Sequence, residues 1–364
     1  MCLEFSLDFK VAFISVIFIS TIKSILSEKS CDMILVDSNS TKIDDVNSYL
    51  HFSAGGYTTL TIYHTLATFI GLVSNSIVLY GSLQYNSIDA DKVSIVMVES
   101  LAILDIIVVL CFMVPTWLTM VATRWVLGDV GCVITGFVGY VCSQAEMVLV
   151  EVVSCHRLFV LSFPFEAWSV TKTHAKCGVA ALVLFSFVMQ VIGHTLGLVW
   201  YFEPRVLLCQ FTSLTDFSAG TKLYHACVMV IFVYIPVVIL PLSNLGILGI
   251  ATAKRRSTDR MNKKALLTVS CVSCTFVLSI TPTIVRIILQ ADTPSWFNIF
   301  SQEMFFVNSL ANPFIYTVVN RRFRRFVRKL LTGRLTARRT VSQFDKSTVV
   351  EGVVEGVVEG TPRV

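Results

Sequence analysis

Seven long apolar stretches dominate the sequence, and each is long enough to cross a lipid bilayer as a helix. A helix rises about 1.5 Å per residue, so about 20 apolar residues span a hydrocarbon core about 30 Å thick. The segments between the stretches are too short to hold a soluble domain of ordinary size. The sequence therefore predicts an all-α membrane protein, a seven-transmembrane helix bundle. The predicted spans are Thr58–Leu83, Lys92–Met120, Asp129–Leu161, His174–Tyr201, Lys222–Thr252, Lys263–Leu289 and Ser295–Val319.

The composition of the chain supports this interpretation. Hydrophobic residues make up 54% of the 364 residues and charged residues 15%, and the mean hydropathy is +0.73. Soluble globular proteins carry about 25% charged residues. The composition therefore excludes an ordinary soluble domain and favours a protein embedded in a lipid bilayer.

Charge placement predicts which side of the membrane each loop faces. The segment Lys254–Lys264 carries six basic residues against one acid, and a second basic cluster follows Asn320. Loops rich in Lys and Arg stay in the cytoplasm, so the C-terminus is predicted to be cytoplasmic. Seven crossings then place the N-terminus outside. The net charge of +5 thus follows from topology, and nucleic-acid binding is not predicted.

Residues 1–57 form a predicted extracellular segment, too short for a separate ligand-binding domain. Its apolar core, Val11–Ile19, leaves two alternatives, namely a signal peptide cleaved after Ser24–Ser27 or an uncleaved segment at the membrane interface. Acidic residues before this core count against a signal peptide. Asn39 begins an Asn-Ser-Thr pattern and is a predicted glycosylation site.

The chain after the seventh span divides into two parts. Asn320–Leu331 predicts an amphipathic helix that lies on the membrane, because its apolar residues fall on one face and its arginines on the other. Residues 332–364 form a polar cytoplasmic tail, which contains a repeated Val-Val-Glu-Gly and is predicted to be disordered. The membrane domain therefore covers residues 58–331.

Acidic side chains within the predicted spans mark candidate functional positions. Glu146 and Glu151 interrupt the third span, and Asp105 lies in the second. A carboxylate at membrane depth is costly unless it faces protein or water. We therefore expect Glu146 and Glu151 to point into the bundle and Asp105 to have a function. Arg157, at the inner end of the third span, can reach the interface or hold a partner.

Two cysteines lie at the predicted outer ends of the spans. Cys132 begins the third span and Cys209 follows the fourth, so both face an oxidising compartment. A disulfide between them is predicted, with Cys31 as the alternative partner.

Short motifs in matching order resemble those of the rhodopsin-like (class A) G-protein-coupled receptors, from about Thr58 to Leu331. The resemblance implies a plasma-membrane receptor with a ligand outside and a heterotrimeric G protein inside. It implies no enzymatic activity, and no nucleophile with a partner base is apparent on a common face. The matching residues are Asn75, Leu101-Ala102 with Asp105, Cys132, Arg157, Cys209, Phe276 with Pro282, and Asn312-Pro313 with Tyr316.

The resemblance assigns roles to several of these residues. Arg157 matches the arginine that engages the G protein when the sixth span swings outward, and Pro282 with Phe276 marks the place of that movement. Cys132 and Cys209 match the disulfide of the family. The Asn-Pro-x-x-Tyr switch of the seventh span is matched by Asn312, Pro313 and Tyr316.

The resemblance also implies an allosteric sodium ion, and no other cofactor. Asp105 matches the acid that binds sodium in inactive receptors, and Asn308, Ser309 and Asn312 complete that polar cluster. Glu146 departs from the family, in which a small polar residue is common. Two nearby acids either share a proton or attract a cation more strongly.

Two departures from the switch motifs leave alternatives open. His156 stands where an acid is expected before Arg157, and Ile280 replaces the usual tryptophan two residues before Pro282. One alternative is therefore a receptor-like protein with weak or constitutive coupling. Another is an ion or proton transporter that uses the intramembrane acids. Transporters show repeated halves, and no duplication is apparent here.

The ligand pocket implied by the resemblance lies between the outer halves of the spans. Receptors for biogenic amines use an aspartate where this chain has Gly139, which disfavours an amine. The expected pocket is polar, so a peptide is the preferred ligand, with a lipid or small neutral ligand as the alternative. The expected lining residues are Tyr140, Ser143, Gln144, Phe232, Thr283, Ile287, Gln302 and Phe306.

Overall fold

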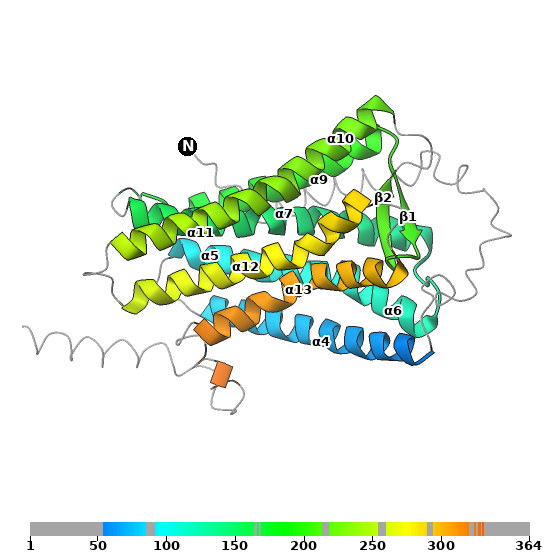
Figure 1. The fold of residues 1–364 in the computed structure, drawn as a ribbon, viewed down its shortest axis with the longest axis horizontal. Coiled ribbons are helices and arrows are strands. Elements are labelled where there is room, and N and C mark those ends of the chain that lie inside the picture. The colour runs from blue at the N-terminus through cyan, green and yellow to red at the C-terminus, as the bar shows by residue number, and fades with distance from the viewer. Residues whose placement is uncertain are drawn as a thin grey trace, which may run out of the picture.

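The computed structural model describes residues 54–84, 92–163, 166, 169–212, 218–253, 260–289 and 294–319, and four further residues between 324 and 330. Over these ranges, the helices form seven spans. The spans run along the long axis of the molecule (Figure 1). The predicted helix bundle is therefore confirmed. Residues 1–53, with Asn39, and the predicted tail 332–364 lie outside the described residues.

Five spans are single α-helices, and the other two contain a π-helical segment. The single helices are α4 (Ala54–Gln84), α7 (Gly128–Ser162), α9 (Lys172–Thr195), α12 (Arg260–Leu289) and α13 (Ser295–Val319). The second span consists of α5 (Lys92–Val108), η1 (Val109–Met113) and α6 (Val114–Ala122). The fifth consists of α10 (Ala219–Met229), η2 (Val230–Tyr234) and α11 (Ile235–Ala253).

A proline follows each π-helical segment. Pro115 comes just after η1 and Pro236 just after η2. A proline lacks an N–H group, and its ring crowds the carbonyl four residues earlier. Those carbonyls belong to Cys111 and Phe232, which both lie inside the π-helical segments. The wider π turn thus makes room for each proline ring without ending the helix.

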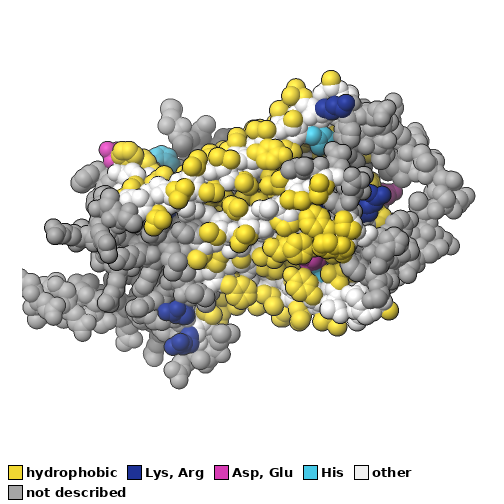
Figure 2. Space-filling model, in the orientation of Figure 1, with side chains coloured by type: hydrophobic (Ala, Val, Ile, Leu, Met, Phe, Trp, Pro, Cys, Tyr) yellow, Lys and Arg dark blue, Asp and Glu magenta, His cyan; other side chains and the backbone are white. Residues whose placement is uncertain are grey.

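The outward surface of the bundle is suited to lipid. Figure 2 shows hydrophobic side chains spread over the middle of the visible face, with the basic side chains toward its ends. Five described spans, the first to the fifth, are long and apolar enough to cross a membrane, and Ser273–Ile287 adds a shorter apolar stretch in α12. The less apolar α13 buries its polar residues against the other helices, including Gln302, Glu303 and Asn308.

The fourth span is shorter than predicted. We expected a helix to Tyr201, but α9 ends at Thr195, and Tyr201 lies in strand β1 (Val199–Glu203). Gly197 has a φ of +87°. Its N–H donates to the carbonyl of His194, and the N–H of Leu198 donates to the carbonyl of Gly193. This pair of bonds around a left-handed glycine is a Schellman motif, which ends the helix.

A β-hairpin covers the outer end of the bundle. Strand β1 pairs antiparallel with β2 (Leu208–Thr212), and a disulfide joins Cys209 of β2 to Cys132 in the first turns of α7. The predicted disulfide is confirmed. Trp200 of β1 stacks on Phe211 of β2, with ring centroids 4.5 Å apart, and packs against the outer half of α7. The disulfide and this aromatic packing hold the hairpin against the third span.

The described part of Asn320–Leu331 agrees with an amphipathic helix. Arg324, Val327, Arg328 and Leu330 are all helical. The two arginines are exposed, whereas Val327 and Leu330 are half-buried. This division places the charged residues toward water and the apolar residues toward lipid or protein.

The close approach of α7 to its neighbours generates a testable prediction. A Cβ atom at Gly139 would overlap the ring of Phe112, whereas a Cβ atom at Gly249 would meet nothing within 4 Å. Overpacking a core costs about 1–3 kcal/mol. We therefore expect Gly139→Val to lower the melting temperature of the detergent-purified protein and Gly249→Val to leave it unchanged. Equal melting temperatures in the two variants would contradict this packing.

Candidate functional site

Five polar residues from three spans meet at the centre of the bundle. All are almost fully buried, with exposed fractions between 0% for Asp105 and 8% for Asn308. They are the five residues proposed above for a sodium site. The members are Asp105 of α5, Glu146 of α7, and Asn308, Ser309 and Asn312 of α13. We call this set the central cluster.

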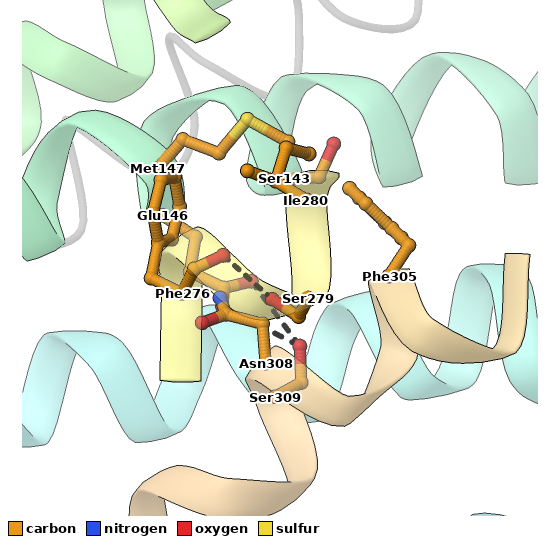
Figure 3. Close-up of a pocket in the computed structure, with 9 residues that line it drawn as sticks. All are labelled: Ser143, Glu146, Met147, Phe276, Ser279, Ile280, Phe305, Asn308 and Ser309. Atoms are coloured by element: carbon orange, nitrogen blue, oxygen red, sulfur yellow. Dashed lines mark hydrogen bonds between the residues drawn. The ribbon is translucent and has the colours of Figure 1, made fainter. Parts of the chain in front are cut away.

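Hydrogen bonds connect the central cluster across the helices. The Asn308 amide donates to Glu146 Oε1 at 2.5 Å, and Ser309 Oγ lies 3.3 Å from Glu146 Oε2. The Asn312 amide donates to Asp105 Oδ2 at 3.2 Å. Each carboxylate therefore binds α13 through an amide side chain. Figure 3 shows the bonds that reach Glu146 from α13.

Asn75 joins the first span to the same region. Its side-chain amide donates to the Ser309 carbonyl at 2.9 Å and to the Gly71 carbonyl at 3.1 Å. The amide thus satisfies a backbone acceptor on α13, next to the central cluster. An interhelical hydrogen bond of this kind favours helix packing in a membrane.

The central cluster contains more acceptors than donors. The carboxylates of Asp105 and Glu146 are close enough to interact electrostatically. No Lys, Arg or His in the described ranges forms an ion pair with either of them. Asp105 Oδ1 and Asn308 Oδ1 are buried and accept no hydrogen bond from a described residue. Two buried, adjacent negative charges are strongly unfavourable, so the arrangement requires a shared proton or a bound cation.

A small cavity adjoins the central cluster. Its volume is about 10 Å³, which is the space that one water-sized sphere occupies. Glu146, Asn308 and Ser309 form its polar wall, and Phe276 and Ile280 of α12 form part of its apolar wall (Figure 3). Ile280 is the residue that stands where the family has a tryptophan. The cavity therefore lies between Glu146 and the part of α12 just before Pro282.

Aromatic packing holds three of the eight expected pocket residues. The ring of Tyr140 lies between Phe112 and Trp200, with centroid distances of 5.4 and 5.3 Å. Phe232 packs on Phe185 at 5.8 Å, and Phe306 packs on His64 at 5.8 Å. These rings belong to the packed interior of the outer half.

The other five expected pocket residues are spread over three spans. Ser143 lines the small cavity beside the central cluster. Gln144 and Gln302 are buried, and the Thr283 hydroxyl donates to the Ser301 carbonyl at 3.2 Å. Ile287 is 38% exposed at the bundle surface. The structure therefore places Ser143 beside the central cluster and Ile287 at the periphery.

A buried ion pair in the outer half was not anticipated from the sequence. His64 Nδ1 lies 2.8 Å from Glu303 Oε1, and His64 Nε2 lies 3.0 Å from the Met113 carbonyl. Both ring nitrogens face acceptors, so histidine and glutamate together hold two protons in these bonds. The pair joins α4, η1 and α13. The rarity of ionisable residues in membrane spans was the available signal, but it does not reveal pairing.

Arg286 is a second residue that the sequence interpretation missed. It lies half-buried in the outer part of α12, within electrostatic range of Tyr140 and Glu203. Its Nε atom is buried and donates to no described residue. Glu203 accepts hydrogen bonds from the Tyr201 hydroxyl at 2.9 Å and from the Arg205 N–H at 3.1 Å. Burial and the Glu203 carboxylate raise the pKa of Tyr201.

The inner half contains the expected coupling residues. His156 and Arg157 lie half-buried in the last turns of α7. Ser154 Oγ lies 3.1 Å from Ser273 Oγ of α12, and Cys155 Sγ lies 3.5 Å from Ser243 Oγ of α11. The inner end of the third span is thus linked to the fifth and sixth spans.

The switch residues of the sixth and seventh spans also lie within helices. Phe276 is buried, with 2% of its side chain exposed, and Pro282 lies inside α12. Pro313 lies inside α13 between the buried Asn312 and Tyr316, of which only the helical backbone is described. Asp259, in the basic loop before α12, lies outside the described residues.

Comparison with known proteins agrees with this architecture. Residues 74–316 match the model of the family described as 7 transmembrane receptor (rhodopsin family). Rhodopsin of Comephorus dybowskii is 25% identical over 288 residues, which cover 74% of this chain and 96% of the relative. Growth hormone secretagogue receptor type 1 of Sus scrofa is 23% identical, with 64% and 70% covered. Proteinase-activated receptor 4 of Mus musculus is 24% identical, with 65% and 62% covered.

The fold also matches a solved structure. The crystal structure of squid rhodopsin aligns with a TM-score of 0.66 at 18% sequence identity. The alignment covers 85% of this chain and 93% of squid rhodopsin. At this identity the likeness establishes the arrangement of the helices.

The His64–Glu303 pair generates a testable prediction. Removing one partner of a buried ion pair costs about 3–5 kcal/mol, whereas replacing both partners by apolar residues of similar volume is nearly neutral. We therefore expect Glu303→Leu to lower the melting temperature and the double variant His64→Phe, Glu303→Leu to recover most of the loss. A double variant as unstable as Glu303→Leu would show that the pair does not link the helices.

Proposed function

The chain belongs to the rhodopsin family of seven-transmembrane receptors. We propose that it couples the binding of an extracellular ligand to the activation of a heterotrimeric G protein, through its third, sixth and seventh spans. It is a G-protein-coupled receptor and not an enzyme. The observation that carries the proposed route is the central cluster, which joins α5, α7 and α13 beside the apolar residues of α12.

Movement of α12 is the proposed output of the receptor. Phe276 and Ile280 line the small cavity beside Glu146, and Pro282 lies in the next part of the helix. A ligand that binds the outer half and favours a tilted α12 would repack these side chains and separate Ser154 from Ser273. The cytoplasmic cleft that opens would expose Arg157 to the G protein.

A peptide is the proposed ligand. One relative is named a secretagogue receptor and another a proteinase-activated receptor, which supports a ligand other than a biogenic amine. Gly139 stands where an amine receptor carries an aspartate, and α13 contains no lysine of the kind that binds retinal. A lipid or a small neutral molecule is the second candidate. We place the receptor in the plasma membrane with its N-terminus outside.

A sodium ion is the proposed allosteric occupant of the central cluster. Asp105 and Glu146 would supply negative charge, and Asn308, Ser309 and Asn312 would supply polar side chains around it. The buried Asp105 Oδ1 and Asn308 Oδ1 have no described donor, which fits a hard cation that prefers oxygen ligands. The bound ion would supply positive charge and favour the closed arrangement of α5, α7 and α13.

Sodium dependence tests this assignment. A ligand present at about 100 times its dissociation constant stabilises a protein by about 2.7 kcal/mol. We expect sodium, exchanged for potassium at constant ionic strength, to raise the melting temperature of the purified receptor. The variant Asp105→Asn should lose that increase, and Glu99→Gln, on the same helix outside the central cluster, should keep it. A sodium-independent melting temperature in the unmodified protein would overturn the site.

Coupling through Arg157 is tested by nucleotide exchange on purified G proteins, with membranes that carry the receptor and no agonist. We expect exchange above background, reduced to background by Arg157→Ala, because the guanidinium is the proposed contact with the G protein. Arg205→Ala, an exposed arginine in the turn of the hairpin, is the matched control. Equal exchange by the Arg157→Ala variant would contradict the proposed contact. Background exchange with every G protein would favour a receptor-like protein that couples weakly.

A further inference from the structure

A second cavity lies in the inner half of the bundle, between α5, α7 and α9. Its volume is about 470 Å³, within the range of about 300–1,000 Å³ typical of sites for small molecules. Most of its wall is apolar and includes Met97, Leu149, Val152, Phe159, Val179 and Leu182. We call this space the side cavity. It is separate from the central cluster, which lies on the opposite face of α7 toward α13.

The side cavity is on the proposed cytoplasmic half of the membrane. Its lining comes from the first turns of α5, the second half of α7 and the first turns of α9. The predicted topology assigns these helix ends to the inner face. His174 and Gly178, which line the side cavity on α9, are both exposed. The side cavity therefore opens on the surface of α9, where the inner leaflet surrounds the protein.

Glu151 is a half-buried acid in this mainly apolar wall. The sequence predicted that its carboxylate points into the bundle, and the structure places it at the side cavity. No described residue forms an ion pair or a hydrogen bond with it. A carboxylate at membrane depth is costly unless a cation or a hydrogen-bond donor approaches it. The other polar side chains of the wall include His156 and His174, and a neutral imidazole can also accept a hydrogen bond.

The shape and charge of the side cavity select one class of occupant. Water is a poor occupant because nearly all of the wall is apolar. An apolar chain would fill the volume, and a protonated amine would place a positive charge with three hydrogen-bond donors beside Glu151. A neutral alcohol would donate one bond and leave the charge uncompensated. A fatty acid would add a second negative charge.

We propose that the side cavity binds an amphiphilic amine, a molecule with a single apolar chain and a protonated amino head, that enters from the inner leaflet and pairs with Glu151. This site is distinct from the outer ligand pocket and from the sodium site. The occupant would contact both α7 and α9. It would lie close to Arg157 along the chain, because His156 lines the same cavity. Binding itself does not depend on coupling to a G protein.

Photolabelling tests this site directly. The purified full-length receptor in phosphatidylcholine nanodiscs is irradiated with a dodecylamine that carries a diazirine in its chain, and labelled peptides are identified by mass spectrometry. We expect labelling within residues 149–159 and 170–182. Excess dodecylamine should displace the label, and excess dodecanol, which has the same chain without the charge, should not.

Two variants test separately the negative charge of Glu151 and the open volume of the side cavity. Glu151→Gln keeps the shape of the side chain and should lower labelling of both segments by about tenfold, because it removes the partner of the ammonium. Gly178→Phe should abolish labelling by filling the side cavity, since a Cβ atom at Gly178 meets nothing within 4 Å. Gly249→Phe, at an equally open glycine of α11, should label like the unmodified receptor.

Three results would overturn the proposal. They are labelling that persists in Gly178→Phe, labelling that is unchanged in Glu151→Gln, and displacement by dodecanol as effective as by dodecylamine. If Gly178→Phe fails to fold, the isosteric Glu151→Gln variant still decides the question. Failure of the nucleotide-exchange experiment leaves these results unaffected, so the site and the coupling function are tested separately.

Discussion

The balance of charge at the centre of the bundle is the constraint on which the arrangement of the spans depends. Asp105 and Glu146 are buried among helices, away from bulk water. The side chains that hydrogen-bond to them are therefore amides and a hydroxyl of α13. Asn308, Ser309 and Asn312 supply them within about one turn of helix. Any movement of α7 against α13 changes these contacts. The same atoms therefore hold the bundle together and respond to its rearrangement.

The outer end is organised by covalent and aromatic contacts. The disulfide between Cys132 and Cys209 ties the hairpin to the start of α7, and Trp200 packs into the space that Gly136 leaves open. The hairpin therefore lies over the outer half of the third span, close to Tyr140.

The ionisable groups within the bundle differ in how many of their hydrogen-bonding atoms have partners in the protein. Both ring nitrogens of His64 have partners, namely Glu303 Oε1 and the Met113 carbonyl, whereas Glu303 Oε2 has no described donor. The central cluster lacks donors for two of its oxygens, and the half-buried Glu151 has no described partner. In a low-dielectric surrounding, an incomplete group indicates a proton, ion or ligand that the chain does not supply.

The sequence alone determined the number and order of the spans, because hydrophobic length and the position of basic loops depend only on local composition. It also predicted the Cys132–Cys209 disulfide, with Cys31 as an alternative partner that the structure decided against, and the residues of the central cluster, through motifs such as Asn312-Pro313. It did not predict the end of α9, because a left-handed Gly197 and the hairpin beyond it are not apparent in an apolar run. The pairing of His64 with Glu303, 239 residues apart, and the side cavity beside Glu151 were decided only by the tertiary structure. Both depend on which faces of distant helices meet, and that is set by packing across the whole bundle.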